Sequence, residues 1–251
     1  MSSELIMDDE TLEDLQPSKY RLIQKKNGFR FGMDSVLLAH FANIHPQASV
    51  VDFGAGSCVL PLLLLIRSKG RDFTCIEIQE EIADMAHRTI QLNHLENRIR
   101  IIHGNAENAH AWIPACSIDA VICNPPYGVP GTCLSSPSAT KAISRNQQSN
   151  MLIGFFRSAF RILKGKGRFC MVYPVSQMLY AMTLLQQAQL EPKRFQLVYP
   201  YENKPANLVL IEAVKDAKPG LHSMMPLIIY TSEHDLTNRL KSVYHIKQNP
   251  V

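Results

Sequence analysis

The fold follows from one stretch of the chain, Val50-Val51-Asp52-Phe53-Gly54-Ala55-Gly56-Ser57-Cys58. A short β-branched run leads through two glycines into an apolar segment, which predicts a buried strand, a tight turn and a helix. Glycines at such a turn let the backbone approach a ligand closely. A dinucleotide site would require a third glycine where Val59 stands, and a phosphate-binding loop would require a Gly-Lys-Ser/Thr sequence that this turn lacks. The turn therefore predicts a nucleoside ligand that carries no pyrophosphate.

Strands and helices alternate along the rest of the chain. The expected strands span residues 50–53, 73–78, 99–103, 118–123, 167–173, 195–199 and 207–214, and the expected helices span residues 58–67, 80–93, 149–163 and 176–189. A further helical run over residues 36–41 should have its N-cap at Asp34, and a long polar loop is expected over residues 124–147. Such alternation predicts a parallel sheet covered by helices on both faces. The connection over residues 200–206 is too short for a parallel crossover, so the last two strands should pair antiparallel. We therefore expect an α/β, Rossmann-like fold with a doubly wound, mostly parallel seven-stranded sheet that ends in an antiparallel hairpin.

Length and composition favour a single domain. The chain has 251 residues with 46% hydrophobic content, and no apolar run reaches the roughly 18–20 residues that cross a bilayer. We expect residues 1–18 to form an acidic flexible leader and residues 19–251 to form one domain. The start of the chain lacks a secretory pattern, and six scattered cysteines are typical of reduced, buried thiols, so a cytoplasmic protein is expected. The nine histidines show no metal-binding spacing, so no metal is expected.

Charge is distributed unevenly along the chain. Residues 1–16 hold six of the 22 acidic residues and no Lys or Arg, so the rest of the chain carries 26 basic against 16 acidic residues. A basic body suits a polyanionic partner such as a nucleic acid, although many proteins without that role are equally basic. Candidate contacts for such a partner are Lys25, Lys26, Arg30, Lys141 and Arg145. An ordinary solvated surface is the alternative interpretation of these residues.

Side chains at the ends of the first three strands predict a cofactor site. Asp52 beside the glycine turn suits the cationic methionine end of S-adenosylmethionine, directly or through water. Glu77 closes the second strand 25 residues later, where a carboxylate can accept hydrogen bonds from both ribose hydroxyls, and Asn105 follows the third strand, where an amide can contact adenine. The expected contacts in these segments are Asp52, Gly54, Ala55, Gly56, Glu77, Ile78, Asn105 and Ala106. The alternatives are that Asp52 caps the following helix and that Asn105 only makes a turn.

The tetrapeptide Asn124-Pro125-Pro126-Tyr127 follows the fourth strand and predicts the catalytic site. A conjugated NH2 group is a poor nucleophile because its lone pair is delocalised. The Asn124 side-chain carbonyl and the Pro125 backbone carbonyl can each accept one N–H bond and hold the nitrogen in line with a methyl donor. The Tyr127 ring can stack on a flat substrate, and Asn124 is also expected to contact the cofactor. The alternative is an ordinary proline turn.

With these motifs the chain resembles the class I S-adenosylmethionine-dependent methyltransferases, and among them the bacterial tRNA1(Val) (adenine-N6)-methyltransferase family. The shared stretches are residues 27–39, 52–56, 124–127, 208–215, 218–221 and 226–230. The resemblance implies methyl transfer from S-adenosyl-L-methionine to N6 of the adenosine next to the anticodon of valine tRNA. In this family residues 28–34 lie against the cofactor, which implies that Phe31 and Asp34 contact it and that Arg30 lies in the pocket. A monomer is expected.

One stretch departs from the family pattern. After the tetrapeptide the family usually carries Ala-Arg-His-Glu, and this chain has Ile143-Ser144-Arg145-Asn146-Gln147-Gln148 instead. The arginine is kept and the acid is lost. If this run contacts tRNA, the change affects the choice of substrate and leaves the transfer machinery intact.

Three other functions fit the same tetrapeptide. Glutamine-N5 methylation of a release factor presents the same chemical problem, but enzymes of that kind carry a helical N-terminal domain, and about 48 residues precede the first strand here. Guanine-N2 methylation of rRNA is the second alternative. The third is an idle, cofactor-binding RNA-binding subunit, which would have no need of Asn124 and Tyr127.

Overall fold

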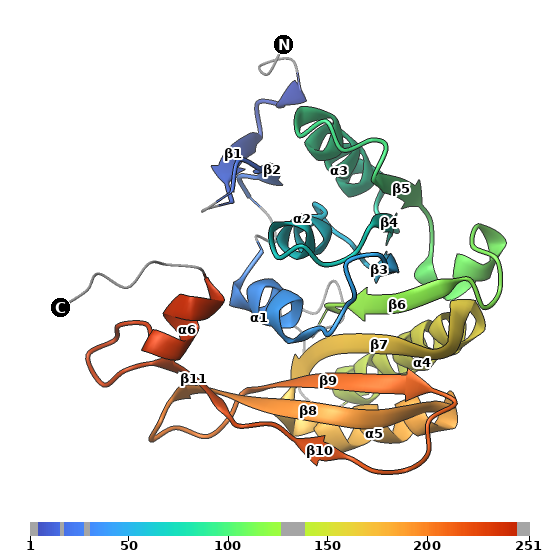
Figure 1. The fold of residues 1–251 in the computed structure, drawn as a ribbon, viewed down its shortest axis with the longest axis vertical. Coiled ribbons are helices and arrows are strands. Elements are labelled where there is room, and N and C mark those ends of the chain that lie inside the picture. Colours follow the sequence, from blue (N-terminus) through green and yellow to red (C-terminus); the bar gives the residue numbers. More distant parts are fainter. Residues whose placement is uncertain (1–4, 16–17, 28–30, 127–138, 245–251) are drawn as a thin grey trace.

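A single large sheet forms the centre of the molecule. The computed structural model describes residues 5–15, 18–27, 31–126 and 139–244, and it describes the side chains of these residues except those of 139–150. Within this part of the chain the strands lie in the order β10-β8-β9-β7-β6-β3-β4-β5, and β11 also pairs with β8 (Figure 1). The strands are β3 (Ser49–Phe53), β4 (Asp72–Glu77), β5 (Ile99–His103), β6 (Ile118–Cys123), β7 (Leu163–Pro174), β8 (Leu190–Tyr201), β9 (Leu208–Lys215), β10 (His222–Ser223) and β11 (Leu227–Tyr230).

The strand directions confirm the predicted α/β fold. Strands β5, β4, β3, β6 and β7 are parallel neighbours, and β9 runs antiparallel to both β7 and β8. The predicted antiparallel hairpin is therefore β8–β9. The described sheet has nine strands rather than seven, because the short strands β10 and β11 add in parallel to the outer edge of β8. Strands of two and four residues show too little alternation to be recognised in the sequence.

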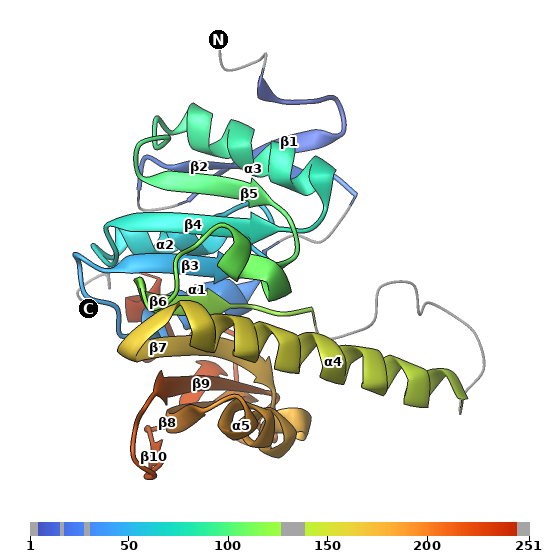
Figure 2. The same cartoon turned by 90° about the vertical axis from the view of Figure 1, so that its right-hand side faces the viewer.

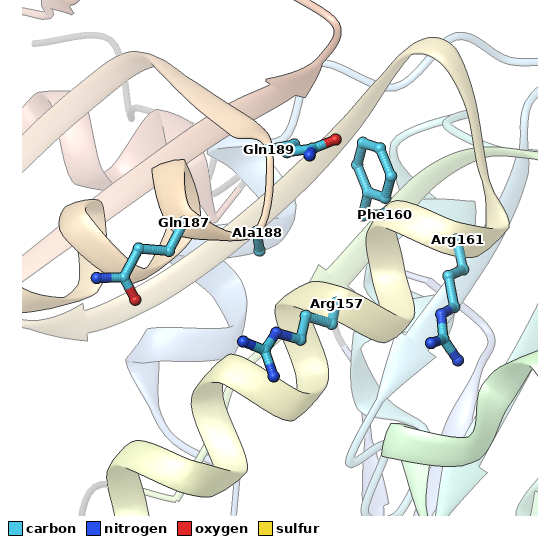
Figure 3. Close-up of a pocket in the computed structure, with 6 residues that line it drawn as sticks. All are labelled: Arg157, Phe160, Arg161, Gln187, Ala188 and Gln189. Atoms are coloured by element: carbon cyan, nitrogen blue, oxygen red, sulfur yellow. The ribbon is translucent and has the colours of Figure 1, made fainter.

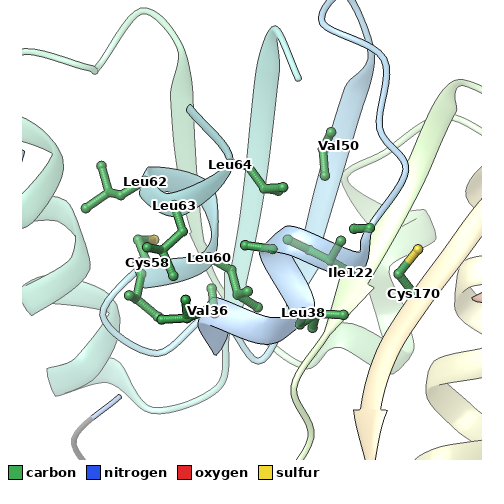
Figure 4. Close-up of a cluster of buried hydrophobic side chains, with 14 of the residues drawn as sticks. Val36, Leu38, Val50, Cys58, Leu60, Leu62, Leu63, Leu64, Ile122 and Cys170 are labelled. Atoms are coloured by element: carbon green, nitrogen blue, oxygen red, sulfur yellow. The ribbon is translucent and has the colours of Figure 1, made fainter. Parts of the chain in front are cut away.

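Helices cover both faces of the sheet (Figure 2). The helices are α1 (Met33–Phe41), α2 (Val59–Ile66), α3 (Glu80–Leu92), α4 (Ala139–Ile162), α5 (Met178–Gln187) and α6 (Asn238–Val243), with short 3-10 helices η2 (Ala106–Ala111) and η3 (Val175–Gln177). Successive residues of β3 face opposite ways, so Val50 packs in a cluster with α1, α2 and α3, whereas Val51 packs with α4 and α5. Leu62 and Leu64 of α2 are fully buried in the first cluster (Figure 4), and burial of each contributes about 1.5–3 kcal/mol.

The N-terminal segment forms a hairpin that packs against α3. Strands β1 (Glu10–Asp14) and β2 (Arg21–Lys25) pair antiparallel. Both carboxylate oxygens of the buried Glu10 accept hydrogen bonds from Arg88 (2.6 and 2.7 Å), and this contact lowers the pKa of Glu10 to about 2. The sequence predicts a flexible leader over residues 1–18, and the structure differs over β1. The strand is not evident from the acidic sequence, because Arg88, which pairs with Glu10, lies 78 residues away.

Two helix starts also differ from the sequence pattern. The pattern places a helix N-cap at Asp34, but the N-cap is Gly32, and Asp34 lies in the first turn of α1, where a carboxylate favours the helix dipole. The sequence predicts a polar loop over residues 124–147, but α4 begins at Ala139. The Pro and Gly residues of this stretch end at Pro137, and Ala139, Lys141 and Ala142 are good helix formers.

Candidate active site

The glycine turn after β3 is open on its outer side. Gly54 and Gly56 have φ values of 70° and 53°, in the region that side chains disfavour. The backbone N–H groups of Gly54 and Ala55 donate to the Ile76 carbonyl (2.9 and 3.1 Å), which fixes the turn to β4. A Cβ added at either glycine would meet no described atom within 4 Å. The two glycines are therefore required by the backbone conformation, and the space beside them can receive a ligand.

Asp52 is a buried carboxylate without a partner. Its side chain is fully buried, and among the described residues neither carboxylate oxygen has a hydrogen-bond partner. Burial raises the pKa of Asp52 well above its usual value, and the neighbouring Glu77 raises it further. A buried, unpaired carboxylate costs free energy unless a donor or a cation satisfies it. Asp52 does not cap α2, whose N-cap is Cys58, so this site fits a cationic ligand better than the capping alternative.

Glu77 closes the same turn from β4. Its side chain is 4% exposed, and its two oxygens accept hydrogen bonds from the N–H groups of Gly56 (2.9 Å) and Gln79 (3.0 Å). These bonds hold the carboxylate at the carboxyl end of β4, beside the open turn. The next residue, Ile78, is a large apolar side chain that is 61% exposed. A flat apolar group such as adenine would cover it.

The segment after β5 is fixed in position by contacts with α4 and with Trp112. The Asn105 side-chain oxygen accepts a hydrogen bond from the Glu107 N–H (2.9 Å) and caps η2, so Asn105 makes the turn that the alternative interpretation expects. A contact with adenine would use its amide nitrogen. The buried Ser158 hydroxyl of α4 donates to the Ala106 carbonyl (2.7 Å). A Cβ at Gly104 would lie 2.3 Å from the Trp112 ring, so this ring packs directly on the backbone before Asn105.

Asn124 stands at the carboxyl end of β6, next to the glycine turn. Cys123 pairs with Phe53 in the sheet, so Asn124 and Gly54 follow neighbouring strands at the same edge. The Asn124 Nδ2 donates to the Ser35 hydroxyl (3.3 Å). Pro125 is buried and Pro126 is exposed. Tyr127 lies outside the described residues, so the structure brings together three of the four predicted catalytic residues.

Ser35 is a site residue that the sequence pattern does not reveal. It is 2% exposed in the first turn of α1, and its partner Asn124 lies 89 positions away. In the sequence Ser35 follows Asp34 as a second polar residue at the start of α1, and nothing local distinguishes it from an ordinary helix-start serine. Holding one end of an amide fixes the direction of the other end, so Ser35 orients the Asn124 carbonyl.

The residues before α1 are only partly described. Phe31 is half-buried and packs against the cluster formed by α1, α2 and α3, and Asp34 lies in the first turn of α1. Arg30 lies outside the described residues, and so do the side chains of Lys141 and Arg145. The contacts predicted for these residues therefore remain predictions.

Lys25 and Lys26 have partners within the chain. The Lys25 ammonium lies 2.8 Å from Asp9 and 3.5 Å from Glu10. Its hydrogen bond to Asp9 is the main reason why the pKa of Lys25 is raised. The Lys26 ammonium donates to the Asp8 carbonyl (2.6 Å). The acidic N-terminal hairpin thus occupies both lysines, which reduces the basic surface predicted for a nucleic acid.

Two cavities lie at the opposite edge of the sheet. One, of about 260 Å³, lies between the end of α4 and the end of α5 and is lined by Arg157, Phe160, Arg161, Gln187, Ala188 and Gln189 (Figure 3). The other, of about 620 Å³, is lined by residues 43–48, 119–120 and 164–168. Both adjoin the amino ends of strands, whereas ligands of open α/β sheets bind at the carboxyl ends. We therefore place the active site at Asn124 and the glycine turn.

The described residues show neither a metal-binding cluster nor a membrane span. They contain no group of three or more His, Cys, Asp or Glu side chains arranged to hold a metal ion. Among the helices described, none combines the length and the apolar character needed to span a bilayer.

Comparison with known proteins identifies the family. Residues 32–191 match the model of the methyltransferase small domain, a range that contains the glycine turn, Glu77 and Asn124. The chain belongs to this family. Membership in the methyltransferase small domain family confirms the prediction of a methyltransferase that uses S-adenosyl-L-methionine.

Named relatives of this methyltransferase are similar along most of their length. The chain is 25% identical to a tRNA1(Val) (adenine(37)-N6)-methyltransferase of Flavobacteriaceae bacterium strain 3519-10, over 72% of this chain and 81% of the relative. Proteins of the same name from Aliivibrio salmonicida (24% identical, 82% and 85% covered) and Erwinia tasmaniensis (28% identical, 77% and 84% covered) are similar to the same extent.

Solved structures confirm the fold of this methyltransferase. A predicted O-methyltransferase of Agrobacterium tumefaciens superposes with a TM-score of 0.68 at 19% identity, over 85% of this chain and 96% of that chain. The TYW2 protein of Pyrococcus horikoshii in complex with MeSAdo gives a TM-score of 0.57 at 15% identity, over 84% and 73%. At these identities the likeness establishes the fold alone.

Proposed function

We propose that the chain transfers the methyl group of S-adenosyl-L-methionine to N6 of an adenosine in tRNA, next to the anticodon of valine tRNA. One observation carries the reaction type: Asn124, oriented by Ser35, stands beside an open glycine turn at the carboxyl edge of the sheet. The relatives named above supply the substrate class. A cytoplasmic monomer is part of the same proposal.

The residues present fit the cofactor. Asp52 offers an unpaired buried carboxylate to the cationic methionine end, and Glu77 offers its carboxylate to the ribose. The exposed Ile78 side chain offers an apolar surface to adenine, and the Asn105 amide lies beyond it. When bound, S-adenosyl-L-methionine supplies an electrophilic methyl group on a sulfonium centre. Ionised Asp52 also favours that positive charge, which tightens binding of the donor.

The protein's part in the transfer is to hold the target nitrogen. The Asn124 carbonyl and the Pro125 backbone carbonyl each accept one N–H bond from the exocyclic amine. Two acceptors on one nitrogen draw its hydrogens out of the ring plane and direct its lone pair toward the donor. Ser35 keeps the Asn124 amide in that orientation before substrate arrives. A base in a single-stranded loop enters such a site at lower cost than a base in a duplex.

An assay with competing substrates tests this function. The purified protein and its Asn124→Ala variant are incubated with isotopically labelled S-adenosylmethionine and, separately, with unmodified valine tRNA, other tRNAs, rRNA and a release factor. We expect N6-methyladenosine in valine tRNA at the nucleoside next to the anticodon, identified by mass spectrometry, and none with the variant. Methylated glutamine in the release factor or N2-methylguanosine in rRNA, with unmodified tRNA, would show that the substrate is wrong.

A further inference from the structure

The carboxyl edge of the sheet is divided at Asn124. On one side, the ends of β3, β4 and β5 carry Asp52, the glycine turn, Glu77 and Asn105, which are the groups assigned to the cofactor. On the other side, β7 is the next strand after β6 and leads into η3 and α5. Because the donor occupies the first side, the substrate must approach Asn124 from the β7 side.

Large exposed apolar side chains flank Asn124 on both sides. The described residues contain six such side chains, namely Met7, Ile78, Leu179, Tyr180, Leu221 and Met225. Ile78 follows β4 on the cofactor side. Leu179 (80% exposed) and Tyr180 (42% exposed) lie together in the first turn of α5, which follows β7 on the other side. The adenine of the cofactor would cover Ile78, and a ligand on the other side of Asn124 would cover Leu179 and Tyr180 in the same way.

The first turn of α5 is fixed in position by contacts of η3 with β7. Tyr173, near the end of β7, is fully buried, and its hydroxyl donates to the Gln177 side-chain oxygen of η3 (3.1 Å). Burial raises the pKa of Tyr173 to about 12, and Tyr180 and Cys123 add to the effect, so the Tyr173 ring lies close to both α5 and the end of β6. The buried Tyr173 therefore connects the helix turn that carries Leu179 and Tyr180 to the end of β6, the strand that precedes Asn124.

The turn between β8 and β9 lies beside η3. The Val175 N–H of η3 donates to the Asn207 carbonyl (3.0 Å), which joins η3 to the turn between β8 and β9. Glu202 and Lys204 of that turn are both exposed, and no acidic residue occurs in α5. The first turn of α5 thus presents an apolar and aromatic patch on a helix without acidic residues, which suits the flat base of a nucleotide.

We propose that Leu179 and Tyr180 form a stacking shelf for the nucleotide that flanks the target adenosine in the RNA substrate. This inference rests on the proposed function. Bases of a single-stranded loop are splayed out and stack on aromatic side chains, and a shelf next to Asn124 would hold the neighbouring base while the target base enters the site. The shelf positions substrate and takes no part in binding the methyl donor.

Substitution of the shelf tests it with two separate readouts. Tyr180→Ala and Leu179→Ala should raise the KM for tRNA about tenfold, as is typical for loss of one stacking contact, and leave the affinity for S-adenosylmethionine unchanged. Tyr180→Phe, which keeps the ring, should behave as the wild type. Met225→Ala removes an equally exposed apolar side chain outside the edge and should have no effect. A 2-aminopurine next to the target adenosine should be quenched on binding to the wild type and less so on binding to Tyr180→Ala.

The outcomes separate the shelf from the proposed function. Methylation of tRNA by both alanine variants with unchanged KM and unchanged quenching would overturn the shelf and leave the function standing. A lower Tm of the ligand-free variants without an effect on tRNA would show that the chain itself covers Leu179 and Tyr180. A change in oligomeric size instead would assign the surface to a protein contact. A wild type that leaves tRNA unmethylated would overturn the proposed function, and the shelf with it.

Discussion

At the scale of single residues, the site depends on side chains whose surroundings are unfavourable without a ligand. Asp52 is fully buried, and none of the described residues gives its oxygens a hydrogen bond. A carboxylate whose pKa is raised in the folded state takes up a proton on folding. Its contribution to stability is therefore largest at low pH, below the unfolded pKa near 3.9, and it is lost as the pH rises through the folded value.

Asp52→Asn should make the ligand-free protein less sensitive to pH and weaken the cofactor site. The fall in Tm as the pH rises from 4 to 8 should be smaller in the variant, because asparagine does not ionise. Affinity for S-adenosylmethionine should fall about tenfold, since a charge-assisted contact is lost. Thermal unfolding and calorimetry measure the two effects, with the exposed Asp72→Asn as control. Unchanged affinity in Asp52→Asn would contradict the assigned contact.

Ser35→Ala should slow transfer without loss of cofactor affinity. The variant removes the hydroxyl that accepts from Asn124, so the amide samples other orientations and its carbonyl meets the substrate amine less often. We expect kcat to fall about tenfold, in the range typical of misplaced reacting groups. Single-turnover kinetics and cofactor titration measure this, with Ser117→Ala, which lacks any contact with the edge, as control. If kcat is retained, Ser35 is only a packing residue.

At the scale of elements, α4 connects the predicted catalytic tetrapeptide to residues 104–107, which we call the adenine loop because Asn105 and Ala106 are assigned to adenine. The helix begins after the tetrapeptide, and its second half holds the segment that contains Asn105 and Ala106. Ser158 donates to the Ala106 carbonyl, and Gly154 leaves room for Glu107, because a Cβ there would lie 2.7 Å from the Glu107 carboxyl carbon. The segment that we assign to the adenine end of the cofactor is therefore supported by the helix that follows Asn124 and Pro125.

Ser158→Ala should make residues 105–106 less well fixed and should weaken the binding of ligands that contain adenine. Loss of the hydroxyl removes the hydrogen bond from Ser158 to the Ala106 carbonyl, at a cost of about 1 kcal/mol. Affinity for S-adenosylhomocysteine should fall, whereas affinity for its inosine analogue, which already lacks the adenine amine, should fall less. Competition binding with both ligands measures the difference. Ser242→Ala removes a similar hydroxyl–carbonyl bond on α6 and should change neither affinity. Equal losses for both ligands would argue against an adenine-specific role.

The β1–β2 hairpin is attached to α3 by an ion pair whose strength depends on pH. Glu10 has a pKa of about 2 in the folded protein, below its usual 4.5, so the stability that it contributes is present above pH 4.5 and is lost as the pH falls toward 2. Glu10→Gln should destabilise the protein by about 3 kcal/mol at pH 7 and by much less at pH 3. Urea unfolding at both values tests this, with the exposed Asp9→Asn as control. An equal loss at both pH values would contradict the ion pair.

At the scale of the whole molecule, local patterns predict the sheet and much of the site. The run through Val50 and the glycines, the β-branched strands and the short β8–β9 connection each depend on neighbours in sequence, so periodicity and loop length suffice. The strand β1, the partner of Asn124 and the contacts of Lys25 are absent from the sequence prediction because each depends on a residue far along the chain. Glu10 and Arg88 are separated by 78 positions and Ser35 and Asn124 by 89, and no local rule links them.

In the proposed mechanism, the carboxyl edge of the sheet binds the donor with one set of residues and transfers its methyl group with another. The most direct test is Asn124→Ala, measured for S-adenosylmethionine affinity by calorimetry and for single-turnover methylation of valine tRNA. We expect nearly unchanged affinity and a transfer rate that is lower by about 100-fold or more. Equal loss of affinity and rate, or a variant that transfers methyl groups as fast as the wild type, would contradict it.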